Sequence, residues 1–203
     1  MKIKMIIFDL DGVLVDACEW HRVALNESLR EVSSYEISMD DHVSTFNGIP
    51  TRKKLKILSE RGLIKPEAQE HIYQLKQNKT LEIIKRDAAV REEKINLIKE
   101  LRNRDIKVAC FTNSIRETAH LMLKLTGIID MFDVIVTNQD VQEPKPSPEG
   151  YNKIINMYNF DINEIIIIED SPKGIQAAKR SGCKVIEVGS PDEVNLDLLK
   201  DYI

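Results

Sequence analysis

Two acidic residues follow a short apolar run near the N-terminus. The run Met5–Phe8 leads directly into Asp9, Leu10, Asp11 and Gly12. Alternate residues of an extended chain share a side, so the two carboxylates are expected to project together. One carboxylate of such a pair can attack an electrophile while the other moves a proton or helps to hold a cation. The same four residues are also compatible with a plain turn that leads into a helix cap.

Two later segments also place polar groups where they could meet a phosphate. Thr112 and Asn113 follow Phe111, and a hydroxyl with backbone N–H groups at a strand-to-helix turn suits phosphate oxygens. Thr112 could equally cap the following helix. Lys145 lies between two prolines, where a stiff backbone would hold its ammonium group against a phosphate and an aspartyl nucleophile. An exposed loop lysine is the alternative for Lys145.

A further segment ends in two adjacent acids. Four isoleucines at 165–168 precede Glu169 and Asp170. Hard cations such as Mg²⁺ prefer oxygen ligands, so this pair is typical of a magnesium site. Asp170 or the next residue, Ser171, could also cap a helix, and that role is compatible with binding a metal.

An alternation of strand and helix patterns would bring these groups together. Helical periodicities separate short β-rich runs at 5–8, 106–111, 134–136, 165–168 and 184–188. This alternation predicts an α/β fold with an open, Rossmann-like parallel sheet. Ligands of such sheets bind at the carboxyl ends of the strands, so we expect the polar segments to form one site.

One long stretch interrupts the alternation. From residue 18 to residue 87 no convincing strand pattern occurs, and apolar residues recur at helical spacing. We therefore predict an all-helical cap domain at 17–87, inserted into a catalytic core made of 1–16 and 88–203. Residues 52–86 carry ten Lys or Arg against four Glu. This excess fits a solvated helix face or, alternatively, an anionic substrate beneath the insert.

Composition narrows the setting. The chain has 203 residues, of which 42% are hydrophobic and 31% charged, as expected of a globular protein with a sizeable core. Its net charge of −4 gives no reason to expect a nucleic-acid partner. No run of about 18 apolar residues occurs, so no membrane span is predicted. Three widely spaced cysteines favour free thiols and a cytoplasmic protein.

Taken together, the polar segments resemble the motifs of the haloacid dehalogenase-like (HAD) superfamily. DLDGVLVD is similar to its first motif, FTNS to its second, KPSP to its third and IEDSPKG to its fourth. The resemblance covers nearly the whole chain and is to the helical-cap subgroup, which includes beta-phosphoglucomutase and phosphoglycolate phosphatase. It implies a phosphatase with Mg²⁺ as cofactor. The substrate would be a small phosphorylated metabolite, in particular a sugar phosphate, and the reaction would pass through an aspartyl-phosphate intermediate.

The resemblance also implies roles for individual residues. Asp9 would be the nucleophile and would ligate Mg²⁺. Asp11 would protonate the leaving alcohol and then deprotonate water, with its backbone carbonyl on the metal. The groups that hold the phosphoryl oxygens would be Thr112, Asn113 and the catalytic Lys145. The remaining metal ligands would be Glu169, directly or through water, and Asp170.

The cap is expected to select the substrate. By the same resemblance, the substrate-facing cap residues would be His21, Gly48, Arg52 and Lys76. Arg52 could grip a second phosphate or a carboxylate through two hydrogen bonds. Hinge packing is the alternative role for His21, and plain solvation is the alternative for Lys76. Ala17 departs from the subgroup, which usually has Ser or Thr at this position after the first motif.

The sequence leaves alternatives to a phosphatase function. A beta-phosphoglucomutase-like mutase would hand the phosphoryl group back to a sugar; Arg52 and His21 favour it, whereas Ala17 disfavours it. A two-component receiver domain fits poorly, because its phosphoacceptor lies on a later strand and it has no cap. A non-catalytic HAD-fold regulator is disfavoured by the intact motif residues, and a dehalogenase is disfavoured by Asp11. We expect no membrane partner, and a monomer or weak dimer.

Overall fold

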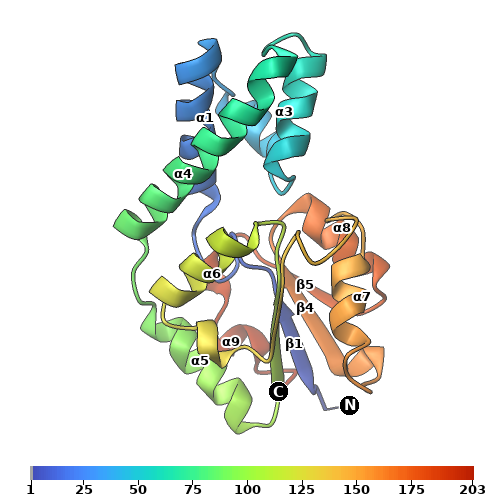
Figure 1. The fold of residues 1–203 in the computed structure, drawn as a ribbon. Helices are drawn as coiled ribbons and strands as arrows, with labels where there is room; N and C mark the ends of the chain where they lie inside the picture. The colour runs from blue at the N-terminus through green and yellow to red at the C-terminus, as the bar shows by residue number, and fades with distance from the viewer. Residues whose placement is uncertain (1) are drawn as a thin grey trace. The chain divides into compact units, whose positions relative to one another are not determined.

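The computed structural model describes residues 2–203, and the chain forms two compact units. One comprises residues 2–16 together with Ala89–Ile203, and the other comprises Ala17–Ala88. The first unit is built on a parallel sheet, and the second is helical (Figure 1). We refer to them as the core unit and the helical unit.

Among the described residues, five parallel strands form the sheet of the core unit, in the order β3-β2-β1-β4-β5. Their bounds are β1 (Met5–Phe8), β2 (Lys107–Phe111), β3 (Val134–Val136), β4 (Ile165–Glu169) and β5 (Lys184–Glu187). Every residue of β1 and β4 is buried, which explains their continuous apolar runs, since both faces of a parallel sheet are covered. The predicted α/β fold with a Rossmann-like parallel sheet is confirmed.

The strand register places the ends of the central strands level with one another. Phe8 is paired with Cys110 of β2 and with Ile168 of β4. Asp9 and Glu169, the next residues of their strands, therefore reach the same edge of the sheet. Strands β2 and β3 lie on one side of β1, and β4 and β5 lie on its other side. The carboxyl end of β1 is therefore a topological switch point.

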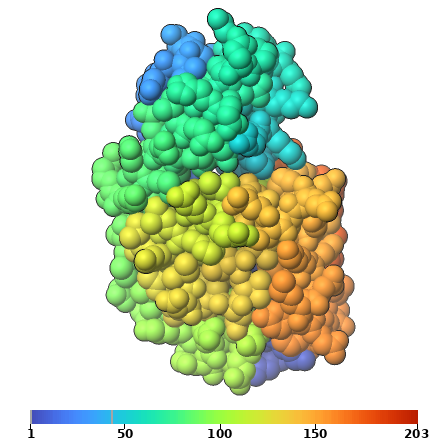
Figure 2. Space-filling view, in the orientation of Figure 1, coloured from blue at the N-terminus to red at the C-terminus, as the bar shows by residue number. Residues whose placement is uncertain are grey.

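Helices cover both faces of the sheet. On one side lie α5 (Glu92–Asn103) and α6 (Arg116–Leu125), and on the other lie α7 (Glu149–Ile155) and α8 (Pro172–Arg180) (Figure 1). In the space-filling view, segments coloured yellow and orange form much of the visible surface of the core unit (Figure 2). Short helices complete the unit: η3 (Ile129–Met131), η4 (Ile162–Glu164), η5 (Pro191–Glu193) and α9 (Leu196–Leu199).

The helical unit is built around its longest helix. Its elements are α1 (Cys18–Ser33), α2 (Met39–Asp41), the π-helical turn η1 (His42–Phe46), α3 (Thr51–Glu60), η2 (Pro66–Ala68) and α4 (Gln69–Asp87). Helix α4 packs against both α1 and α3, and apolar residues such as Leu25, Phe46 and Ile72 fill the interior. No described residue of this unit belongs to a strand, as predicted for the insert.

The structure also tests two expectations from composition, namely free thiols and the absence of a membrane span. None of the three cysteines forms a disulfide within the described residues, and Cys110 and Cys183 are buried. Burial raises the pKa of the Cys110 thiol well above its usual range, so this residue is an inert part of the core. Within residues 2–203, none of the helices has the length and apolar character that a membrane span needs.

Candidate active site

The end of strand β1 carries the first acid and turns sharply away. The backbone N–H of Asp9 donates to the Ile168 carbonyl at 3.0 Å, and the Asp9 side chain is buried. Gly12 has a φ of 92°, a conformation that residues with a side chain rarely adopt. A Cβ atom at Gly12 would also overlap the Asp170 carboxylate. Glycine therefore lets the turn after β1 pass directly against the acid that follows β4.

Lys145 is the cation at the centre of this site. Its Nζ atom donates to Asp9 Oδ1 at 2.5 Å, to Glu169 Oε1 at 2.6 Å and to the Phe111 carbonyl at 2.8 Å. The side chain is 3% exposed, so an exposed loop lysine is not what the structure shows. Burial alone would lower the pKa of Lys145, but the Asp9 and Glu169 carboxylates outweigh it and raise the pKa above its ordinary value. The ammonium group is therefore charged at neutral pH.

Both carboxylate oxygens of Glu169 are engaged by groups of the core unit. Oε1 accepts hydrogen bonds from Lys145 and from the Tyr151 hydroxyl, the latter at 2.7 Å. Oε2 accepts from the backbone N–H of Asp170 at 3.1 Å and from the Ser171 hydroxyl at 3.3 Å. A Cβ atom at Gly174 would overlap this carboxylate, so α8 can pack against it only with glycine there. The buried Glu169 carboxylate thus fixes the position of the Lys145 ammonium group.

Two hydroxyl groups hold Asp11. Thr112 Oγ1 donates to Asp11 Oδ2 at 3.1 Å, and Ser114 Oγ donates to the same oxygen at 2.9 Å. Thr112 does not cap a helix, because α6 begins only at Arg116 and the residue before it provides no side-chain cap. Instead, Thr112 Oγ1 accepts the backbone N–H of Ser114 at 2.9 Å. The segment after β2 therefore supports the second acid of the first motif.

Asn113 ties the segment after β2 to the lysine loop. Its Oδ1 atom accepts the backbone N–H of Lys145 at 3.0 Å, and its Nδ2 atom donates to the Lys145 carbonyl at 3.3 Å. Its own backbone carbonyl accepts from the Asn138 side chain at 2.9 Å. The side chain of Asn113 is thus committed to positioning Lys145.

The acids suit a divalent cation. Asp9, Glu169 and Asp170 each offer an oxygen, and these oxygens lie within 4.8 Å of one another. Asp170 Oδ1 is buried and has no hydrogen-bond partner among the described residues. Burial and the charge of Glu169 raise the pKa of Asp170 to about 7, and the same two causes raise the pKa of Asp9 well above its usual range. A hard cation with oxygen ligands would satisfy the orphaned oxygen and offset the repulsion.

The helix that follows β4 is capped by Ser171. Its Oγ atom accepts the backbone N–H of Gly174 at 3.2 Å, and Pro172 occupies the first helical position. The sequence allowed either Asp170 or Ser171 to cap this helix, and the structure shows that Ser171 does so. Asp170 is left with a carboxylate that the helix does not use.

The predicted cap residues fall at two places within the helical unit. His21 Nδ1 and Lys76 Nζ lie 3.0 Å apart, and Lys76 is buried. Arg52 instead donates to both carboxylate oxygens of Glu70, at 2.6 and 3.2 Å, and its side chain is 60% exposed. Gly48 has a φ of 74° in the turn before α3.

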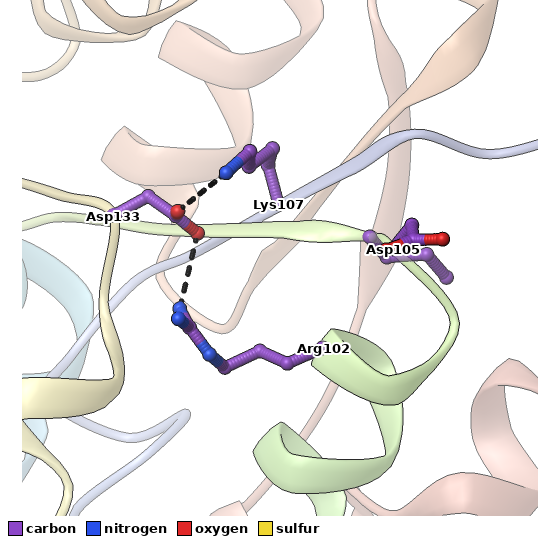
Figure 3. Close-up of a pocket in the computed structure, with 5 residues that line it drawn as sticks. Arg102, Asp105, Lys107 and Asp133 are labelled. Carbon is purple, nitrogen blue, oxygen red and sulfur yellow. Dashed lines mark hydrogen bonds and ion pairs between the residues drawn. The ribbon is translucent and has the colours of Figure 1, made fainter.

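A pocket of about 280 Å³ lies away from the acids, where strands β2 and β3 begin (Figure 3). Lys107 and Arg102 both bind the Asp133 carboxylate there, at 2.9 and 3.4 Å. Asp133 also accepts the backbone N–H of Val108 at 2.9 Å. The two cations share one carboxylate, which links α5 and β2 to the residue before β3.

Comparisons with known proteins identify relatives of the chain. A family model described as haloacid dehalogenase-like hydrolase matches residues 6–188. The phosphorylated carbohydrates phosphatase of Thermotoga maritima is 29% identical over 187 residues, which are 90% of this chain and 83% of the relative. The pyrophosphatase PpaX of Bacillus velezensis is 27% identical over 195 residues, 92% of this chain and 83% of the relative. A solved beta-phosphoglucomutase from Clostridium difficile has a TM-score of 0.83 at 22% identity, covering 98% of this chain and 96% of that one.

These matches confirm the family and the enzyme class that the motifs predicted, a phosphoric monoester hydrolase. The structural likeness adds the fold, a Rossmann-like core with a helical insert. The family model spans most of the chain and includes all four strand ends at which the acids, the hydroxyls and the lysine meet. The chain belongs to the haloacid dehalogenase-like hydrolases.

Proposed function

We propose that this hydrolase is a Mg²⁺-dependent phosphatase of a small phosphorylated metabolite, in particular a sugar phosphate. The observation that carries the proposal is the buried contact between Lys145 and Asp9, at 2.5 Å. A buried carboxylate beside a permanent cation is a nucleophile prepared for an anionic electrophile. The names of the related phosphatases, one acting on phosphorylated carbohydrates and one on pyrophosphate, support the same substrate chemistry.

Asp9 would attack the phosphorus atom and carry the phosphoryl group as an aspartyl phosphate. Burial and Glu169 favour the protonated acid, whereas the charge of Lys145 favours the carboxylate that the reaction requires. Thr112 and Lys145 would hold the equatorial oxygens of the phosphoryl group, because phosphoryl transfer depends mainly on positioning and on neutralised charge. Asn113 would support them by fixing the backbone of Lys145.

Asp11 would move the proton. Its protonated form would donate to the leaving oxygen, and the resulting carboxylate would then take a proton from the attacking water. The hydroxyls of Thr112 and Ser114 both bind one oxygen of Asp11, which leaves the carboxyl group oriented by two donors. Water would release phosphate and regenerate the Asp9 carboxylate.

Mg²⁺, when bound, would neutralise phosphoryl oxygens and lower the repulsion between the substrate and the acids. Asp9, Asp170 and the backbone carbonyl of Asp11 would hold it, with Glu169 as a ligand directly or through water. The unpartnered Oδ1 atom of Asp170 supports this assignment.

A panel of phosphorylated metabolites with Mg²⁺ tests the proposal. Released phosphate and isomerised sugar phosphate are measured separately, and an aryl phosphate reports on the core unit alone. We expect phosphate release to dominate, because Ala17 adds no hydroxyl beyond those of Thr112 and Ser114 to restrain Asp11 from activating water. If beta-glucose 1-phosphate with a trace of bisphosphate gives glucose 6-phosphate much faster than free phosphate, the protein is a mutase. No phosphate release from any ester would refute the phosphatase.

A further inference from the structure

Ser114 lies where a serine usually caps a helix, but its hydroxyl group donates to Asp11 instead. Serine is a preferred residue at the start of a helix, and α6 begins two residues later, at Arg116. The residue directly before α6, Ile115, provides no side-chain cap. The Ser114 hydroxyl donates to Asp11 Oδ2 at 2.9 Å. The serine therefore serves the proposed proton donor of the reaction rather than the helix.

The main chain that carries Ser114 is held by the segment that follows β3. The backbone N–H of Thr112 donates to the Val136 carbonyl at 3.0 Å, and the backbone N–H of Asn138 donates to the Ser114 carbonyl at 3.3 Å. The Asn138 side chain donates to the Asn113 carbonyl at 2.9 Å. Three consecutive residues are therefore tied to one neighbouring segment, and the serine hydroxyl is presented from a defined main-chain position.

The hydroxyl of Thr112 also reaches Asp11, but it has only one proton to donate. Thr112 Oγ1 accepts the backbone N–H of Ser114 at 2.9 Å and gives its proton to Asp11 Oδ2 at 3.1 Å. Because the backbone N–H of Thr112 is used in the sheet, the hydroxyl is the group that would donate to a phosphoryl oxygen. One proton cannot serve both acceptors. Binding of the phosphoryl group would therefore take Thr112 away from Asp11, while the contact with Ser114 persists.

The contact with Ser114 should strengthen as Asp11 gives up its proton. Both hydroxyls donate to Oδ2, which occupies the lone pairs of that oxygen, so the proton of the acid form lies on Oδ1. Negative charge develops on the carboxyl group when this proton moves to the leaving oxygen. A hydrogen bond to a charged acceptor is about twice as strong as one between neutral groups. An interaction that is stronger in the transition state than in the ground state accelerates the step.

We propose that Ser114 is a positioning residue that holds Asp11 for proton transfer once the phosphoryl group has engaged Thr112. In the first step Asp9 forms a bond to phosphorus, the bond from phosphorus to the leaving oxygen breaks, and the proton of Asp11 Oδ1 moves to that oxygen. Hydrolysis of the aspartyl phosphate by water then returns a proton to Asp11. The inference rests on the proposed phosphatase function and deepens it.

Two aryl esters with different leaving groups test this role. 4-Nitrophenolate is a weak base that leaves without a proton, whereas the more basic phenolate of phenyl phosphate needs the proton of Asp11. The ratio of kcat/KM for 4-nitrophenyl phosphate to kcat/KM for phenyl phosphate therefore measures the dependence on the acid. Ser114→Ala should raise this ratio by about tenfold, the effect of one lost hydrogen bond to a charged group. A merely structural role would lower both rates equally.

Ser181→Ala is the matched control, because its hydroxyl donates to the Ala178 carbonyl at 2.7 Å, at the end of α8. This variant should keep the wild-type ratio. Asp11→Asn should raise the ratio more than Ser114→Ala does, and adding Ser114→Ala to Asp11→Asn should raise it no further. Thermal melts establish that each variant is folded. Ser114→Cys, which has a weaker donor, gives a second test and should change the ratio in the same direction.

The possible results separate this inference from the proposed function. If Ser114→Ala hydrolyses both esters with the wild-type ratio, the inference is overturned and the phosphatase stands. A further rise of the ratio when Ser114→Ala is added to Asp11→Asn would also overturn it, because the serine would then act by a route other than Asp11. If the wild type hydrolyses no ester at all, the phosphatase proposal fails and this inference fails with it.

Discussion

Replacing Lys145 with methionine should destabilise the protein strongly at neutral and alkaline pH. The buried ammonium group donates to Asp9 at 2.5 Å, to Glu169 at 2.6 Å and to the Phe111 carbonyl at 2.8 Å. Methionine fills a similar volume but leaves two buried carboxylates without their cation. Removing one partner of a buried ion pair costs about 3–5 kcal/mol in the free energy of unfolding.

The loss should be smaller in acid. Burial and acidic neighbours raise the pKa of Asp9, and they raise that of Asp170 to about 7. In the unfolded chain both titrate near the usual value of about 3.9. The folded protein thus binds more protons than the unfolded chain between about pH 4 and 7, and its stability falls as the pH rises through that window. The charge of Lys145 lowers both pKa values, so its removal makes this fall steeper.

Urea unfolding followed by circular dichroism, in EDTA at about pH 5 and pH 8, measures the effect. Lys107→Met is the control, because Lys107 pairs with Asp133 at 2.9 Å with its side chain 47% exposed (Figure 3). A pair of that kind contributes about 0–1 kcal/mol. A Lys145→Met variant as stable as the wild type at pH 8, or a loss of equal size at both pH values, would refute the reasoning.

Four other perturbations test the remaining parts of the molecule. EDTA should abolish hydrolysis of an aryl phosphate and Mg²⁺ should restore it; turnover that persists in EDTA contradicts the proposed metal site. Asp9→Asn should lower kcat by about a thousandfold or more while the fold is kept, because an amide is a poor nucleophile; a wild-type rate removes Asp9 from the mechanism. Tyr151→Phe deletes one donor to the buried Glu169 and should cost about 1.5–3 kcal/mol in urea unfolding, so an unchanged midpoint contradicts that contact. Because the pKa of His42 is lowered to about 4, the unfolded chain binds a proton that the folded protein does not bind between about pH 4 and 6.5, so stability falls as the pH falls through that window. His42→Gln should remove that part of the acid sensitivity, and identical pH profiles of unfolding for both proteins would exclude it.

The fold and the place of the site could be predicted because buried parallel strands leave strong local signals. Apolar runs that end in Asp9 and in Glu169 are what fully covered strands require, and their polar ends must meet at one edge of the sheet. The bounds differ by single residues: β2 begins at Lys107, one residue later than expected, and β4 includes Glu169. Such differences arise because strand ends depend on the neighbouring strand.

The contacts inside the site could not be predicted, because they depend on tertiary packing. Tyr151 has the spacing of an apolar helix position, yet its hydroxyl reaches Glu169 of another element. Thr112 could have capped a helix, and only the late start of α6 assigns its hydroxyl to Asp11. Lys54 lies in a basic stretch whose members look alike in the sequence, and burial alone distinguishes it.

The paired hydrogen bonds between Asn113 and the backbone of Lys145 hold the main chain at this lysine in place, whereas the carboxylates hold its charged end. These bonds join neutral groups, so their strength depends less on a neighbouring charge than the strength of an ion pair does. The ammonium group, in contrast, is held by carboxylates, and the charge of one of them would change in the proposed mechanism, in which Asp9 gains and loses a phosphoryl group. In that mechanism the main chain beneath the lysine would stay in place while its ammonium group exchanges partners, so each turnover would begin with the cation already positioned for the next substrate.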